Sequence, residues 1–413
     1  MKTDVVVYAD WDALGLPTRA GILTAERIRR HAVFHFAYDA RWLVDKNRVA
    51  LDPQLQLFSG DQYKEGEGNF GIFLDSCPDR WGRLLMTRRE ALYAQREGRK
   101  EKKLGDIDFL LGVHDQSRMG ALRFNQEENG AFLNDDDQQT APAMTSLKEL
   151  AHAASVIEKD EGFATDEYIK WLSLLISPGS SLGGARPKAS VVDKNNHLWI
   201  AKFPSYQDAC DIGAWEYVVH QLAMDAGIEM ADCQLTKIHS RHHTFLTKRF
   251  DRTNEGKRKH FCSAMTLLGY KDGDTGQSYL ELAEFLMQFG VNSTEGLAQL
   301  FRRLVFNIAV SNTDDHLRNH GFIYKGKGWC LSPAYDINPV TPAQGLHLNI
   351  NETDNRLSFE LALETAKFYR LTHNDAQKII KEVKAAVSHW REQAQDAGIG
   401  RAEQQRKQAA FHV

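Results

Sequence analysis

The chain has 413 residues, which is enough for about two or three domains with substantial cores. Its apolar fraction of 42% and charged fraction of 26% are typical of a globular protein and exclude a disordered or fibrous one. The formal net charge of −4 argues against a protein that coats nucleic acid through a global positive field.

Cysteine usage and apolar runs indicate the cellular setting. The five cysteines are dispersed and contain no Cys-x-x-Cys pair, so neither a disulfide framework nor a thiolate zinc site is indicated. Asp4 falls where a signal peptide would need a long apolar region, and no run of about 18 apolar residues occurs. We therefore expect a cytoplasmic protein that does not associate with membranes.

The first third of the chain predicts a small β-rich domain followed by helices. A β-branched run at residues 5–8 and apolar alternation at 32–38 predict strands. Asp79 precedes a helical apolar pattern and is a candidate capping acid. The arginines and lysines clustered between residues 80 and 103 favour a solvated helix face over a nucleic-acid or partner site.

The acidic, Gln-rich segment 125–142 is the best candidate linker. After it, Ser146 with Glu149 three residues on predicts a capped helix start with a capping box.

Residues 177–205 contain a glycine-rich loop followed by two strands, at 188–192 and 198–203, with Lys202 on the second. Such a loop exposes backbone N–H groups to phosphate oxygens, and a strand lysine adds a point charge. The segment is neither a Walker motif nor the usual kinase Gly-x-Gly-x-x-Gly, so a surface hairpin is the alternative.

Helix 211–226 carries Glu216, which could pair with Lys202 as in kinases or be an exposed acid. Strands at 233–238 and 243–250 then lead to Phe250, a location suited to a hinge that meets adenine. Nearly everything later is predicted to be helical, in four segments: 279–289, 294–310, 359–369 and 374–394.

A dense polar loop follows the apolar run 304–310 and precedes two short strands. In protein kinases the catalytic Asp precedes its metal-binding Asn by five positions, and a second metal-binding Asp follows. Asp314 and Asn319 have this spacing, and Asp336 is the later acid. A capped helix with an Asx-rich loop is the alternative.

These features predict an α+β, bilobal, protein-kinase-like fold with a small β-rich N-terminal subdomain and an all-helical C-lobe. The expected domains are residues 1–105, 106–252 and 253–413. We expect the second to hold the glycine-rich loop and the third to hold the catalytic and metal-binding loops.

Five ordered motifs resemble those of HipA-like serine/threonine kinases, the toxins of bacterial toxin–antitoxin systems: SSLGGARPKAS, WIAKFPS, LTKRFDR, NTDDHLRNH and AYDIN. The segment LDSCPDRWGR resembles the end of that family's amino-terminal domain. The resemblance runs from the first strand to about Arg370, and it implies a HipA/PI3-4-kinase-like fold.

The resemblance also implies roles for individual residues. Asp314 falls on the catalytic aspartate, and Asn319 and Asp336 fall on the magnesium ligands. The residues assigned to ATP binding are Ser181, Gly183, Gly184, Lys188, Lys202, Phe250, Asp251 and His316. Ser181 falls on the loop serine that family members autophosphorylate, although the neighbouring Ser180 is an alternative or additional phosphosite.

The chain departs from the family pattern at three places. Gly183-Gly184 and Arg186-Pro187 stand where other members often have Ala-Gly and Gln-Glu, and Lys248 occupies a hinge position that is often acidic. Pro187 should stiffen the loop, and Lys248 puts the adenine-edge contacts in doubt.

The implied partner is a HipB-like DNA-binding antitoxin, through which the protein would meet DNA only indirectly. The implied substrate is a translation component such as an aminoacyl-tRNA synthetase, and the implied role is in persistence. One alternative is a catalytically weak corepressor for the antitoxin. The other is a metal-dependent hydrolase that uses His316 and His320 on one helix face, although the chain lacks the zincin Glu.

Overall fold

The computed structural model describes residues 2–28, 31–127, 130–133, 141–159, 166–176, 184–238 and 240–413. It divides into two compact units, the first comprising Met1–Tyr206 and Asp251–Cys262 and the second Gln207–Phe250 and Ser263–Val413. The three-domain division expected from the sequence stays a prediction.

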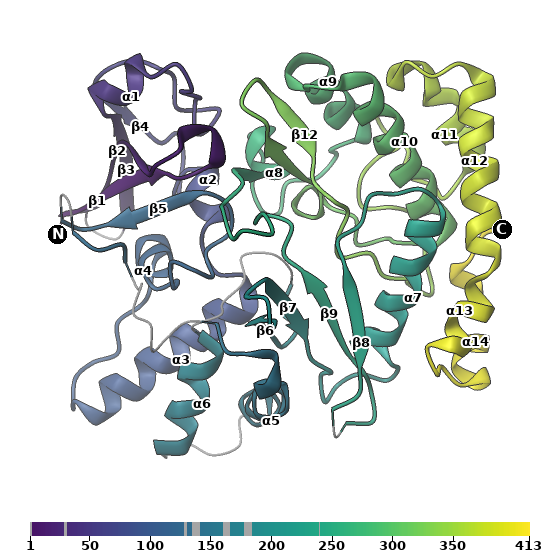
Figure 1. The fold of residues 1–413 in the computed structure, drawn as a ribbon, viewed down its shortest axis with the longest axis horizontal. Coiled ribbons are helices and arrows are strands. Elements are labelled where there is room, and N and C mark those ends of the chain that lie inside the picture. Colours follow the sequence, from purple (N-terminus) through teal and green to yellow (C-terminus); the bar gives the residue numbers. More distant parts are fainter. Residues whose placement is uncertain are drawn as a thin grey trace. The chain divides into compact units, whose positions relative to one another are not determined.

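The first unit begins with an antiparallel sheet whose strand order is β4-β3-β2-β1-β5 (Figure 1). Its strands are β1 (Lys2–Ala9), β2 (Thr18–Ile28), β3 (His31–Tyr38), β4 (Asp61–Tyr63) and β5 (Leu122–Asn125). Val5 pairs with Leu23, and Leu23 with Phe36, and all three side chains are fully buried. This core confirms the predicted β-rich start of the chain.

Helices complete the first unit, together with a hairpin of β6 (Lys188–Val192) and β7 (Leu198–Lys202). The helices are α1 (Ala40–Val44), α2 (Gly71–Asp75), α3 (Arg80–Arg96), α4 (Asp106–Leu111), α5 (Leu147–Glu158) and α6 (Asp166–Ile176). Phe73 of α2 packs against the sheet, with ring centroids 5.8 Å from Phe36 and 6.1 Å from Phe124. This aromatic packing joins α2 to strands β3 and β5 of the sheet.

The two predicted helix starts differ in outcome. Asp79 caps α3 by accepting a hydrogen bond from the backbone N–H of Gly82 at 2.8 Å, as predicted. The predicted capping box at Ser146 is wrong, since its side chain makes no capping hydrogen bond. Ser146 ends a short 3-10 helix (Met144–Ser146), so its backbone (ψ of 4°) lacks the extended conformation that a capping side chain needs.

Four members of the basic cluster between residues 80 and 103 are paired with acids. Its ion pairs include Arg83–Asp106, Arg96–Asp166, Arg99–Glu90 and Lys102–Asp108. These pairs fit the prediction of a solvated helix face.

The second unit is mainly helical and contains two hairpins (Figure 1, teal to yellow). Its helices are α7 (Ile212–Asp225), α8 (Ala264–Leu267), α9 (Tyr279–Phe289), α10 (Ser293–Ala309), α11 (Phe359–Thr365), α12 (His373–Ser388), α13 (Trp390–Asp396) and α14 (Arg401–Lys407). Its hairpins pair β8 (Cys233–Thr236) with β9 (Thr244–Lys248), and β11 (Gly321–Tyr324) with β12 (Trp329–Leu331). Strand β10 (Phe261–Ser263) contains the sequence boundary between Cys262 of the first unit and Ser263 of the second. The C-lobe is therefore helical apart from short strands.

The long helix α10 forms the centre of the second unit and packs against α9, α11 and α12. Its inward-facing Leu300, Phe301 and Leu304 are fully buried. Burial of such side chains contributes about 1.5–3 kcal/mol each. The helix ends at Ala309 and so fixes the start of the loop that carries Asp314.

No helix within the described ranges is both long and apolar enough to cross a membrane. All five cysteines are free.

Candidate active site

The Asp314 loop connects α10 to β11 through a short 3-10 helix (Leu317–Asn319). The carbonyl oxygen of Asp314 accepts hydrogen bonds from the backbone N–H of His316 at 3.1 Å and from the side-chain amide of Asn319 at 2.9 Å. The loop therefore brings together the two residues that the kinase spacing singled out. Because the Asn319 nitrogen donates to Asp314, its amide oxygen is left to serve as a ligand atom.

The two adjacent acids of the loop have different environments. Asp314 is exposed, whereas the side chain of Asp315 is buried and accepts hydrogen bonds from Tyr279 and from the ring of His320 at 3.2 Å. Burial raises the pKa of Asp315, but the charge and hydrogen bond of His320 and the Tyr279 hydroxyl outweigh it, so its pKa lies below the usual value. Asp315 therefore has a structural role, and Asp314 is the acid that is accessible to a substrate.

A chain of side-chain amides extends this buried network. Asn307 of α10 donates to the Tyr279 hydroxyl at 2.8 Å, and Asn312 donates to Asn307 at 3.1 Å. The oxygen of Asn312 accepts from the backbone N–H of Asn338 at 3.2 Å. The network thus ties the Asp314 loop to the segment that follows Asp336, which brings the two predicted acidic motifs into one hydrogen-bonded assembly.

The backbone is strained at both motifs. Ser311 and Asp336 have φ values of +51° and +58°, in the left-handed region. Residues other than glycine are uncommon there, and such conformations gather at functional sites. The carbonyl of Ser311 also accepts hydrogen bonds from the N–H groups of Thr313 at 2.9 Å and Val340 at 3.2 Å, which is a second link between the two segments.

An aromatic contact connects the predicted hinge to the same assembly. Phe250 stacks on Tyr335 with ring centroids 5.5 Å apart, and the Tyr335 hydroxyl donates to the carbonyl of Arg318 at 2.8 Å. Phe250, at the end of the β8–β9 hairpin segment, therefore lies against the residue that precedes Asp336.

Three predicted phosphate-loop residues, Ser180, Ser181 and Gly183, lie outside the described residues. Gly184 is described, and its carbonyl accepts a hydrogen bond from the ammonium group of Lys188 at 2.8 Å. The same ammonium group forms a buried ion pair with Asp79 at 2.6 Å. Lys188 therefore anchors the hairpin to the cap of α3. The buried Lys202 lies directly opposite Lys188 in the strand register.

The carboxylate of Asp251, the predicted ribose contact, is fully buried within the first unit. It accepts hydrogen bonds from the backbone N–H of Gly120 at 2.8 Å and from Arg252 at 2.5 Å. Arg252 also donates to the carbonyl groups of Gln116 and Arg118 at 3.0 and 2.9 Å. In this structure the carboxylate thus holds the chain after the hinge against residues 116–120.

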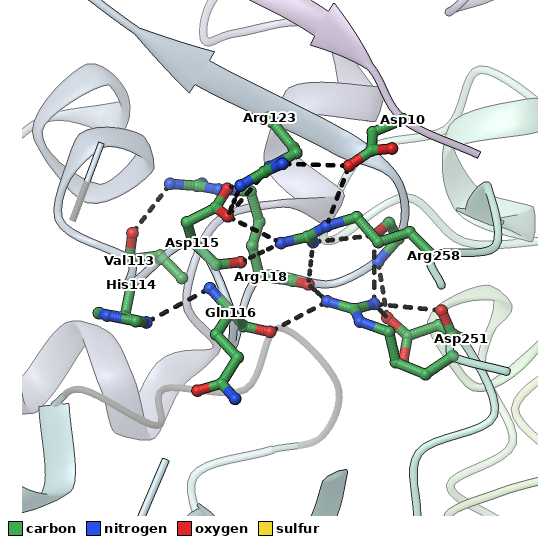
Figure 2. Close-up of polar contacts among 11 residues, drawn as sticks. Asp10, Val113, His114, Asp115, Gln116, Arg118, Arg123, Asp251 and Arg258 are labelled. Atoms are coloured by element: carbon green, nitrogen blue, oxygen red, sulfur yellow. Dashed lines mark hydrogen bonds and ion pairs between the residues drawn. The ribbon is translucent and has the colours of Figure 1, made fainter. Parts of the chain in front are cut away.

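A second arginine strengthens this cluster, as Figure 2 shows. Arg258 donates to the carboxylate of Asp115 at 3.0 Å, and Arg123 donates to the same carboxylate at 2.6 Å. Burial raises the pKa of Asp115, but Arg258 and Arg123 outweigh it and hold that pKa below the usual value. No sequence pattern indicates this cluster, because its two groups of residues, 115–123 and 251–258, are more than 100 positions apart.

The histidines of the Asp314 loop do not form the helical pair that the hydrolase alternative required. His316 and His320 have extended backbones on either side of the 3-10 helix, so they share no helix face, and that expectation is wrong. The ring of His320 bonds to Asp315, and the ring of His316 packs edge-on against His347 at 5.8 Å. In the part of the chain that the structure describes, no three or more His, Cys, Asp or Glu side chains group to hold a metal ion.

The predicted site residues are divided between the two units. Gly184, Lys188, Lys202 and Asp251 belong to the first unit, and Phe250, Asp314, His316, Asn319 and Asp336 belong to the second. Their roles in binding and catalysis stay predictions.

Comparison with known proteins identifies the family. The model of the HipA-like C-terminal domain matches residues 180–390, just over half of the chain. The chain therefore belongs to the family of proteins with a HipA-like C-terminal domain, as its motifs predicted.

Two relatives are described as putative kinases. One, from Haemophilus influenzae, is 28% identical over 185 residues, which cover 40% of this chain and 54% of that protein. The chain thus spans about half the length of this relative. The other, putative kinase Y4dM of Sinorhizobium fredii, is 26% identical over 325 residues, which cover 74% of this chain and 72% of that protein.

The fold is similar to that of HipA from Shewanella oneidensis, solved as a toxin–antitoxin complex of HipA and HipB with operator DNA. The TM-score is 0.65 at 16% identity, and the match covers 98% of this chain and 94% of that one. This likeness confirms the predicted HipA-like fold class.

Proposed function

We propose that this protein is an ATP- and Mg²⁺-dependent serine/threonine protein kinase of the HipA toxin type. The observation that carries the proposal is the pairing of an exposed Asp314 with Asn319 in a loop tied to the Asp336 segment. Family membership and the two relatives described as putative kinases support the same activity.

In the proposed reaction a substrate hydroxyl attacks the γ-phosphorus of ATP, the bond to the β-phosphate oxygen breaks, and ADP leaves. Asp314 orients the hydroxyl and accepts its proton. Asn319 and Asp336 supply an amide oxygen and a carboxylate, which are the oxygen ligands that Mg²⁺ prefers. The metal, when bound, neutralises charge on the β- and γ-phosphates.

The remaining predicted residues are assigned to the nucleotide. We propose that Lys202 contacts the ATP phosphates, with Ser181, Gly183, Gly184 and Lys188 in or beside the glycine-rich loop. Phe250, Asp251 and His316 are proposed to line the nucleotide site. Since Lys188 and Asp251 are engaged by Asp79, Gly120 and Arg252, we expect their effect on the nucleotide to act mainly through loop and hinge position.

Regulation is proposed to follow from autophosphorylation of Ser181 or Ser180. A phosphate adds about −1.5 to −2 charges, which a site built around a polyphosphate would repel. The proposed partner is a HipB-like antitoxin, supported by the likeness to HipA solved with HipB and operator DNA. The proposed substrate is a translation component, such as an aminoacyl-tRNA synthetase, in the cytoplasm.

Phosphopeptide mass spectrometry after incubation with Mg²⁺ and ATP tests the proposal. The matched variants are Asp314→Asn and Asp396→Asn, the second of which changes an exposed acid at the end of α13. We expect phosphate at Ser181 or Ser180 in the wild type and in Asp396→Asn, and none in Asp314→Asn. An unmodified wild type, or equal labelling of all three proteins, would remove the kinase proposal.

The same samples test the corepressor alternative. ATP with Mg²⁺ should raise the thermal stability of a protein that binds nucleotide. A wild type that binds the antitoxin and ATP but transfers no phosphate would favour the corepressor. Phosphoproteomics after induction in cells would then identify the substrate of an active enzyme.

A further inference from the structure

Residues 401–412, here called the 401–412 segment, lie beyond the region that matches the family model. The segment consists of α14 (Arg401–Lys407), a 3-10 helix (Gln408–Ala410), Phe411 and His412. Three of its residues contact the start of α7, the segment after Asp336 and the start of the Asp314 loop, all within the second unit.

The first contact is at the amino-terminal end of α7. The carboxylate of Glu403 accepts hydrogen bonds from the backbone N–H of Asp211 at 2.9 Å and from the Trp215 indole at 2.8 Å. A carboxylate at this end of a helix also interacts favourably with the helix dipole. The helix held in this way carries the buried Glu216 one position after Trp215.

The second contact is with the segment that follows Asp336. The ammonium group of Lys407 donates to the carbonyl of Pro339 at 2.8 Å, three residues after Asp336. Lys407 therefore adds a further hydrogen bond to this segment, between the bonds of Asn338 to Asn312 and of Val340 to Ser311.

The third contact is with the start of the Asp314 loop. The backbone N–H of His412 donates to the carbonyl of Ala309 at 2.8 Å, and its ring lies 2.9 Å from the Ser311 hydroxyl. Ser311 has the left-handed backbone described above, and such conformations persist only where their surroundings hold them. His412 therefore supports the strained residue three positions before Asp314.

Aromatic packing anchors the segment so that these contacts are held rigidly. The ring of Phe411 stacks on Trp390 with centroids 4.4 Å apart and planes 4° from parallel. Phe411 also lies 5.9 Å from Trp215 of α7. The side chains of Trp390, Phe411 and Trp215 are all buried.

We propose that the 401–412 segment is a positioning element of the active site, which fixes α7, the Asp336 segment and the Asp314 loop through Glu403, Lys407 and His412. The inference rests on the proposed kinase function. None of the three side chains needs to touch a substrate. Lys407 and His412 hold backbone close to residues assigned to metal binding and catalysis, where a displacement of about 1 Å can cost about 100-fold in rate. Glu403 holds the start of α7.

Variants at Lys407 test the proposal with a matched control. In Lys407→Ala we expect kcat for phosphate transfer to fall by about 10- to 100-fold and half-saturation by Mg²⁺ to need several-fold more metal, since Asp336 loses support. KM for ATP should change by less than about two-fold, because Lys407 bonds to Pro339 and not to a residue assigned to the nucleotide. Lys407→Arg keeps a donor for Pro339 and should restore most of the rate.

The control is Arg406→Ala, which removes an exposed positive charge one residue away. It should match the wild type in kcat and in Mg²⁺ dependence. Equal behaviour of Lys407→Ala and Arg406→Ala would overturn the inference, as would a failure of Lys407→Arg to recover activity while the thermal stability of all variants stays the same.

A second measurement does not depend on catalysis. In Lys407→Ala and His412→Ala we expect faster amide hydrogen exchange at residues 311–319 and 336–340, and unchanged exchange in β1–β3. If the wild type transfers no phosphate, the kinase proposal fails, and hydrogen exchange still decides this inference. Unchanged exchange in both loops would overturn it.

Discussion

The side chain of Asn312 bridges two loops, since its nitrogen donates to Asn307 and its oxygen accepts from the backbone N–H of Asn338 at 3.2 Å. Asn312 lies two residues before Asp314, and Asn338 lies two residues after Asp336. One amide group therefore links the loop of the proposed proton acceptor to the segment of a proposed metal ligand.

We expect Asn312→Ala to destabilise the protein by about 1–3 kcal/mol, because it leaves buried polar groups of Asn307 and Asn338 without this partner. Phosphate transfer should fall by about 10-fold or more, because the loops lose their alignment. Asn374→Ala, at an exposed position of α12, is the control for denaturation and activity measurements. Full activity in Asn312→Ala would show that the bridge is not needed for alignment.

Lys188 was assigned to the nucleotide, but its ammonium group is paired with Asp79 in the protein interior. Breaking a buried ion pair from one side costs about 3–5 kcal/mol. Lys188→Met should therefore lower the free energy of unfolding by about 3 kcal/mol, whereas Lys194→Met in the exposed β6–β7 turn should have little effect. Weaker ATP binding with unchanged stability would instead establish Lys188 as a direct nucleotide contact.

Local patterns predicted much of the fold. The helix expected at residues 279–289 is α9 with the same bounds, and the helix expected at 211–226 is α7 with Asp211 as its cap. In both helices the apolar periodicity and a nearby capping residue indicate the same helix start. Strand β2 was not predicted, because its sequence lacks a β-branched run and contains Gly21. A Cβ atom at Gly21 would lie 2.2 Å from the carbonyl oxygen of Ala37, so the neighbouring strand requires glycine there.

The candidate site was predicted only in part, for a physical reason. Motif spacing identified Asp314 and Asn319, which are five positions apart. It also identified Asp336, the later acid of the family pattern. The supporting contacts join distant residues, such as Ser311 with His412 and Asp79 with Lys188, which are 101 and 109 positions apart. No periodicity links such residues, because only tertiary packing brings them together.

His260 predicts how stability depends on pH. It stacks on Trp11 with centroids 4.6 Å apart, and burial lowers its pKa from 6.5 to about 3. Between these values the unfolded chain binds a proton that the folded chain does not, so the free energy of unfolding falls as the pH falls, by about 1.4 kcal/mol per pH unit.

His260→Phe keeps an aromatic ring on Trp11 and removes the titrating group. Urea denaturation of both proteins at about pH 7 and about pH 5 should show that the wild type loses about 2 kcal/mol more than the variant. Equal losses would mean that the pKa of His260 in the folded state is close to its unfolded value.

The most direct test of the kinase account measures nucleotide binding and phosphate transfer in the same preparations of wild type and Asp314→Asn. Loss of a proton acceptor that acts on the attacking hydroxyl should lower kcat by about 100-fold or more, while Kd for ATP with Mg²⁺ stays within about two-fold. If transfer is unchanged, or if ATP binding is lost together with transfer, Asp314 is not the catalytic acid–base group and the account is contradicted.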